Sequence, residues 1–230
     1  MTARKSSSID GNLLLEALNA ADRALLAPHV ERREVSRGDV LFRAGDDVSH
    51  GYLPAFGQAV VQVGGPVIRI DAARLSAAKH ASKGIRDLFV RYADCLLAQV
   101  LQSVACNAAH TIERRCLRWL LTLQDRIGTA ELPVTHELLA DMLGVRRAYL
   151  TEVLGRMQRE GLIGIGHGRI TLPDRARAEA GACECHATVR RHFEEVMGAV
   201  YAPGGRIIAV DVAEPERLRP PSTVVREGSP

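Results

Sequence analysis

The sequence predicts an α+β fold: a block of short antiparallel strands, a long helix, then a helix-turn-helix followed by a small hairpin. Short apolar runs separated by glycines fill residues 30–70, and apolar residues recur every three or four positions over 85–104. Two amphipathic segments on either side of Gly144 lie within 133–172. With 47% hydrophobic residues among 230, the chain can bury a core and has room for one large or two small domains.

The N-terminal part is expected to change from helix to strand near residue 30. Leucines within 13–30 predict a helical region, and residues 1–12 offer nothing to bury. Runs rich in valine and isoleucine then alternate with glycines, which is typical of small antiparallel strands. Only two or three such strands fit between Tyr52 and Arg69.

The helix predicted after Ser82-Lys83-Gly84 carries two apolar stripes. The first comprises Ile85, Leu88, Phe89, Tyr92, Leu96, Val100 and Val104, and the second comprises Leu97, Leu101, Ala105 and Ala108. One stripe can face the strand block, so the second predicts another partner. The same helix of a second subunit, packed as a parallel coiled coil, fits this requirement. Burial of the whole helix within its own domain is the alternative.

The rest of the chain is predicted to be mainly helical. Thr135 suits the N-cap of a helix, and Gly144 permits the positive φ of a sharp turn. The predicted elements are a hinge at 107–110, helices at 111–127, 135–143 and 146–160, strands at 162–165 and 170–172, a polar stretch at 173–180 and a helix at 185–200. Residues 203–230 are rich in Pro, Gly and charge, which predicts a mostly disordered tail with one strand at 206–212.

Charge is distributed unevenly on the helix predicted at 146–160. It opens with two arginines, and its polar side holds Arg146, Arg147, Tyr149, Thr151, Glu152, Arg156 and Arg159. A helix fits the major groove of B-DNA, where an arginine can pair with guanine and a carboxylate with cytosine N4. The alternative is a solvated face on an ordinary helical hairpin.

The segment VTHELLADMLGVRRAYLTEVLGRMQREGLI, followed by GHGRI, resembles the winged helix-turn-helix of the Crp/Fnr family of bacterial transcription regulators. The resemblance implies base contacts by Arg147, Ala148 and Glu152. It also implies that Thr135, His136 and Glu137 lie against phosphates. This sequence departs from the family in having Arg146 where a capping Ser or Thr is frequent, and Ala148 where an acidic residue is frequent.

The full predicted DNA-binding set adds residues near these positions. Tyr149 and Thr151 are expected to help base reading, Arg146 and Arg156 to hold phosphates, and Arg169 in the wing to touch the backbone. The set is Thr135, His136, Glu137, Arg146, Arg147, Ala148, Tyr149, Thr151, Glu152, Arg156 and Arg169. Double-stranded DNA is the predicted partner, and the resemblance implies a homodimer and RNA polymerase as further partners.

The N-terminal block resembles the opening of the cyclic-nucleotide-binding β-roll of the same family, through Arg37–Phe42 and Ala44–Asp46. The block is too short for a complete roll. It lacks the Gly-Glu segment followed by Arg-Ser or Arg-Thr that would hold a ribose and cyclic phosphate. A buried phosphate needs a charged partner or backbone N–H groups, and neither can be located in this sequence. The protein is therefore predicted not to bind cAMP or cGMP with useful affinity.

Five predicted segments follow from these interpretations. They are a truncated cyclic-nucleotide-binding-like β-roll (13–74), connecting and dimerisation helices (75–109), a winged helix-turn-helix DNA-binding domain (110–180), a C-terminal helix (181–202) and a disordered tail (203–230). A decayed protein that dimerises with an intact paralogue is the competing hypothesis.

The stretch Cys183-Glu184-Cys185-His186 has ligand-like chemistry, and Cys106, His110 or Cys116 could complete a zinc or iron site. Cys-x-Cys is not the usual Cys-x2-Cys chelate, however, so structural cysteines are expected and no metal or cofactor is predicted. Redox or metal sensing through Cys183 and Cys185 remains an alternative. No enzymatic motif stands out, and no export signal or membrane span is apparent, so a cytoplasmic non-enzyme is expected.

Overall fold

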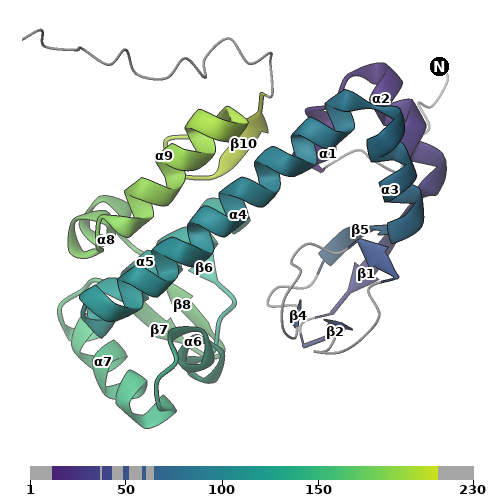
Figure 1. Cartoon of the computed structure of the whole chain (residues 1–230). Coiled ribbons are helices and arrows are strands. Elements are labelled where there is room, and N and C mark those ends of the chain that lie inside the picture. The colour runs from purple at the N-terminus through teal and green to yellow at the C-terminus, as the bar shows by residue number, and fades with distance from the viewer. Residues whose placement is uncertain (1–11, 37, 43–48, 52–58, 61–64, 212–230) are drawn as a thin grey trace, which may run out of the picture.

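The N-terminal part of the described chain forms two short helices and two small sheets. Figure 1 shows the fold of the whole chain. This computed structural model describes residues 12–36, 38–42, 49–51, 59–60 and 65–211, so the arm predicted at 1–12 lies almost wholly outside it. The helical elements are α1 (Leu13–Glu16), α2 (Ala20–Leu26) and the 3-10 turn η1 (Ala27–His29). Asn12 and Asn19 cap the two helices, since their side chains accept from the backbone N–H groups of Leu15 and Asp22.

The predicted small antiparallel strands are present. They are β1 (Val30–Val35), β2 (Val40–Phe42), β3 (His50–Gly51), β4 (Ala59–Val60) and β5 (Gly65–Asp71). Strand β5 lies between β1 and β3, with Val30 opposite Ile70 and Val35 opposite Gly65. Strands β2 and β4 pair separately.

Two helices joined at Ser82 lead away from this block: α3 (Ala72–Ala81) and α4 (Lys83–Ala109). The Ser82 hydroxyl accepts from the Ile85 N–H at 3.1 Å and donates to the buried Asp22 carboxylate at 2.5 Å. The junction is therefore fixed to α2. The long helix begins at Lys83, two residues before the start that the sequence predicts, because Ser82 caps it.

The two apolar stripes of α4 are divided differently from the prediction. Ile85, Leu88 and Cys95 are buried, whereas Val100 and Val104 lie on the exposed side with the second stripe. An α-helix has 3.6 residues per turn, so a side chain four residues further along lies about 40° further around the helix. The predicted stripe moves from Leu96 to Val100 and Val104 in such steps and therefore leaves the buried face. The exposed stripe of α4 consists of Val90, Leu97, Val100, Leu101 and Val104.

The remaining elements form the C-terminal half. They are α5 (Ile112–Ile127), β6 (Glu131–Leu132), α6 (His136–Leu143), α7 (Arg147–Arg159), β7 (Gly164–Gly166), β8 (Arg169–Thr171), α8 (Arg175–Gly181), α9 (Cys185–Met197), β9 (Ala199–Tyr201) and β10 (Ile207–Val210). Helix α8 occupies the stretch expected to be merely polar, and Asp174 caps it. Strand β10 corresponds to the one predicted at 206–212 and pairs with β9, while residues 212–230 lie outside the described part.

Helix α9 turns back and runs alongside α4 (Figure 1). Its Met197 is buried in the same hydrophobic cluster as Leu26, Ile85 and Leu88, and Phe193 packs against that cluster. The C-terminal helix therefore completes the N-terminal core. A separate cluster built on α5, α6 and α7 forms the core of the C-terminal domain.

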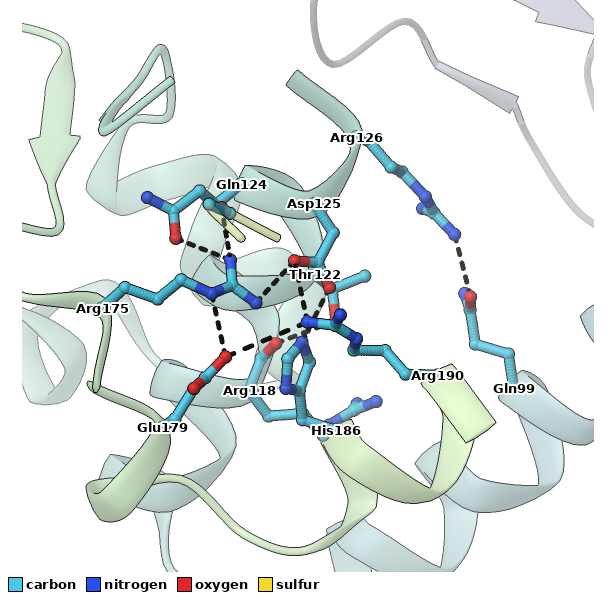
Figure 2. Close-up of polar contacts among 11 residues, drawn as sticks. Gln99, Arg118, Thr122, Gln124, Asp125, Arg126, Arg175, Glu179, His186 and Arg190 are labelled. Carbon is cyan, nitrogen blue, oxygen red and sulfur yellow. Dashed lines mark hydrogen bonds and ion pairs between the residues drawn. The ribbon is translucent and has the colours of Figure 1, made fainter. Parts of the chain in front are cut away.

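Figure 2 shows a buried ionic network that joins α5 to α8 and α9. Asp125 is 5% exposed and pairs with Arg175 at 2.7 Å and with the His186 ring at 2.8 Å. Arg190 lies 3.7 Å from the same carboxylate and stacks on the Tyr201 ring at 4.0 Å. One carboxylate thus holds three helices of the C-terminal half together.

Candidate DNA-binding interface

The helix-turn-helix forms as the sequence predicts. Thr135 caps α6, its hydroxyl accepting from the Leu138 N–H at 3.2 Å, and Gly144 ends the helix with φ of 67°. Helix α7 follows after a short turn and lies at the end of the molecule remote from α1 and α2 (Figure 1). The buried side chains of α6 and α7 are Leu139, Ala140, Leu143, Leu150, Val153, Leu154 and Met157.

The outer face of α7 consists of the residues predicted to meet DNA. Arg146, Arg147, Ala148, Tyr149, Thr151, Glu152 and Arg156 are all exposed. The first turn of α7 carries no acidic side chain, so its free N–H groups and the two arginines give this end a positive character. This arrangement suits a polyanion.

A chain of side-chain contacts links α6 to the start of α7. His136 Nδ1 lies 3.2 Å from the Thr151 hydroxyl, which donates to the Arg147 carbonyl at 2.9 Å. Burial lowers the pKa of His136, and the positive charge of Arg147 lowers this pKa further. Three of the predicted residues therefore share one surface patch, and Glu137 is exposed in the first turn of α6 beside them.

Arg156 has a partner within the protein. Its guanidinium pairs with Glu113 of α5 at 2.5 Å. Burial raises the pKa of Glu113, but hydrogen bonds from its own backbone N–H, from Arg156 and from Thr111 outweigh burial and leave this pKa below its usual value. A phosphate contact by Arg156, as the sequence predicts, would have to share or replace this ion pair.

The wing is a three-stranded antiparallel sheet in the order β6, β8, β7. Gly166 pairs with Arg169, leaving a two-residue turn in which Gly168 has φ of 69°. Arg169 projects an exposed side chain that pairs with Glu131 at 2.9 Å. The predicted wing residue therefore lies on this sheet, and the carboxylate of Glu131 already pairs with its charge.

Two arginines that the sequence did not single out position the recognition helices. Arg115 of α5 donates to the Leu143 carbonyl at 2.6 Å, and Arg177 of α8 donates to the Glu160 carbonyl at 2.7 Å. Each satisfies a carbonyl at a helix C-terminus, where the helix itself provides no donor. Nothing in the sequence distinguishes these two arginines from the many others. Their contacts with the helix ends become apparent only in the folded structure.

Residues 114–179 match the Crp-like helix-turn-helix domain. These residues are a Crp-like helix-turn-helix domain. The match begins within α5 and runs to α8, so it includes both recognition-motif helices and the wing. It confirms the predicted resemblance on the part of the chain that carries the arginines of α7.

Three solved structures share the fold. A Crp/Fnr family protein from Eubacterium rectale is 19% identical, with 73% of this chain and 96% of that chain covered and a TM-score of 0.54. FixK2 from Bradyrhizobium japonicum is 14% identical over 67% and 98%, also with a TM-score of 0.54. The c-di-GMP responsive regulator CLP from Xanthomonas campestris is 18% identical over 67% and 99%, with a TM-score of 0.52. No curated protein sequence matches the chain.

The predicted fold class is thereby confirmed: a mixed α and β fold with a long helix and a C-terminal helix-turn-helix, of the Crp/Fnr type. None of the helices in the described residues combines the length and apolarity needed to cross a membrane.

Proposed function

We propose that this protein is a sequence-specific DNA-binding transcription regulator that acts as a homodimer on double-stranded DNA. The observation that carries the proposal is the open, arginine-led face of α7 within a Crp-like helix-turn-helix domain. Phosphate contacts supply affinity and orientation, whereas contacts to base edges supply specificity. Such a regulator would act in the cytoplasm, with RNA polymerase as its further partner.

The proposed roles follow from position on α6, α7 and the wing. Arg147 and Glu152 read bases, helped by Ala148, Tyr149 and Thr151. Thr135, His136, Glu137, Arg146 and Arg156 lie against the phosphates, and Arg169 touches the backbone from the wing.

The exposed stripe of α4 supports a dimer. Val90, Leu97 and Val104 recur every seven residues, Leu101 lies between two of them, and each is 57–63% exposed. A seven-residue repeat of apolar side chains is the pattern by which parallel helices pair. Pairing two copies of α4 would remove this apolar surface from water and present two α7 helices to one duplex. Half-sites should then lie about one helical turn of DNA apart.

Regulation is proposed not to depend on a cyclic nucleotide. The sequence between β2 and β5 lacks the Gly-Glu and Arg-Ser or Arg-Thr pair that would hold the cyclic phosphate. Calorimetric titration with cAMP and cGMP tests this part separately, and binding at micromolar concentration or tighter would contradict it.

The central experiment selects the binding site from random duplexes and then measures binding of Arg147→Ala by fluorescence anisotropy. Loss of a bidentate contact to guanine should cost about 1–3 kcal/mol, roughly a 5- to 150-fold weaker Kd, and should relax one base position. Arg159→Ala in the last turn of α7 is the matched control, expected to weaken all sequences by a similar small factor. Equal losses on every sequence for Arg147→Ala would assign this side chain to the phosphates instead.

The short strand block also favours a second candidate, a decayed regulator that pairs with an intact paralogue. Here the purified homodimer would bind no genomic fragment at low salt, yet the chain would co-purify with the paralogue. Selection of a defined duplex by the homodimer alone excludes this second function.

A further inference from the structure

Four metal-ligating side chains from distant parts of the sequence meet where α4, α5 and α9 come together. Cys106 lies in the last turn of α4, His110 follows that helix, and Cys183 and Cys185 lie at the start of α9. One ligand atom from each residue, a sulfur from each cysteine and a ring nitrogen of His110, lies within 4.8 Å of the other three. The three cysteines are at most 3% exposed.

The distances suit a tetrahedral metal ion. The Cys106 and Cys183 sulfurs are 3.5 Å apart, and the Cys185 sulfur is 3.5 Å from the His110 Nδ1. Zinc with Zn–S of about 2.3 Å and Zn–N of about 2.0–2.1 Å sets its ligand atoms roughly 3.5–3.8 Å apart. Only small side-chain adjustments separate the observed cluster from that geometry.

The surroundings of the cluster also fit a metal site. The other ring nitrogen of His110, Nε2, lies 3.0 Å from the Glu184 carboxylate, which leaves Nδ1 facing the sulfurs. A metal-bound histidine commonly makes this contact to a carboxylate, which fixes the ring and makes it a better ligand. The Gln102 amide donates to the Cys185 sulfur at 3.0 Å. Such a donor stabilises a thiolate.

Charged side chains near the site offset part of the charge of a metal-bound cluster. Three thiolates and one dication would leave a net charge of −1. Burial raises the pKa of Cys106, and the nearby buried guanidinium of Arg118 opposes that effect. Arg114 lies 3.8 Å from Glu184, so the carboxylate that orients His110 is itself neutralised.

We propose that Cys106, His110, Cys183 and Cys185 bind one zinc ion. Four protein ligands leave no open position, which is the arrangement of a structural rather than a catalytic zinc. The ion would join the α4–α5 junction to the start of α9 and so fix the DNA-binding domain against the long helix. The site is independent of the face of α7 and does not require that the protein bind DNA.

Two other cysteines provide matched controls. Cys95 is buried on the same helix as Cys106, and Cys116, which the sequence offered as a ligand, is buried in the core of the C-terminal domain. Replacing either by alanine removes a buried thiol without touching the cluster. A general effect of losing a thiol can therefore be separated from loss of the metal.

The test measures zinc by mass spectrometry in the full chain, purified under reducing conditions without a histidine tag. We expect about one zinc per chain in the wild type, Cys95→Ala and Cys116→Ala. Cys106→Ala, Cys183→Ala and Cys185→Ala should each bind zinc at least about tenfold more weakly, which a competing chelator measures. Removing zinc should lower the Tm of the wild type and leave that of Cys183→Ala unchanged.

Reconstitution with Co²⁺ keeps the proposal falsifiable if a variant folds poorly. Refolded wild type should show thiolate-to-cobalt charge transfer and the visible bands of a tetrahedral site. A folded, fully reduced wild type that takes up neither zinc nor cobalt would overturn the proposal, as would an unchanged zinc affinity in all three cluster variants. An iron–sulfur chromophore, or a Cys106–Cys183 disulfide in protein isolated without reductant and zinc-free, would overturn it as well.

Discussion

Replacing Asp125 by alanine should destabilise the protein far more than replacing any surface carboxylate. Asp125 is 5% exposed and faces Arg175, His186 and Arg190. Removing one partner of a buried ion pair typically costs about 3–5 kcal/mol, because a charge is left buried without compensation. Arg175 would keep Glu179 at 2.8 Å and the Gln124 amide oxygen at 2.9 Å. The expected loss is therefore at the lower end, about 3 kcal/mol.

Glu179→Ala provides the matched control, because it removes the other carboxylate that pairs with Arg175. The Glu179 side chain is 43% exposed, so its loss should cost only about 0.2–1 kcal/mol. Urea denaturation followed by circular dichroism gives both free energies of unfolding. In thermal scans the Asp125→Ala loss corresponds to a Tm lower by roughly 6–12 °C for a chain of this size. Equal losses for the two variants would refute the reasoning that burial makes the Asp125 network strong.

Three further predictions concern α4 and the helix-turn-helix. Gly144→Ala should destabilise the protein by about 1–2 kcal/mol, because Gly144 has a left-handed backbone conformation. Gly155→Ala within α7 should stabilise the protein by roughly 0.5–1 kcal/mol. Equal effects of the two changes in urea denaturation would contradict both. Arg147→Ala should raise the pKa of His136 in an NMR titration, since the arginine charge lowers it; an unchanged midpoint would show that the two do not interact. Leu101→Arg should convert the proposed dimer to a monomer in analytical ultracentrifugation, and a persisting dimer would place the interface elsewhere.

Local signals made the helix-turn-helix predictable from the sequence. A capping threonine, a glycine that permits positive φ and apolar spacing of three and four residues act over a few positions, and each is present as expected at Thr135, Gly144 and α7. The strand block and the start of α4 followed from similar local rules. Helix α8 was missed because its apolar content is low, and it is held by the cap of Asp174 and by arginine contacts to other elements.

The packing of α9 could not be read from the sequence, because it depends on a long-range contact. A predicted C-terminal helix says nothing of which element it covers, and Met197 resembles any other apolar residue near the end of a helix. In the fold it enters the core built by α2 and α4. The strand block that the sequence predicts is too short for a complete roll and would leave apolar surface to be covered. Met197 of α9 and Val210 of β10 pack in the same cluster as Ile70 of that block.

The same long-range contact explains why spacing rules argued against a metal site. Cys-x-Cys read along the chain is a poor chelate, and the other two candidate ligands lie more than seventy residues away. Glu184 between the cysteines contacts the Nε2 of His110, on the side of the ring away from the sulfurs, while Cys183 and Cys185 are buried in one cluster with Cys106. Once α9 lies against α4, Cys183 and Cys185 come together with Cys106 and His110, and the four residues form one potential set of ligands. A rule for zinc sites based on local spacing therefore fails where the fold itself brings the halves together, and this is why the metal content of the purified protein is the informative measurement.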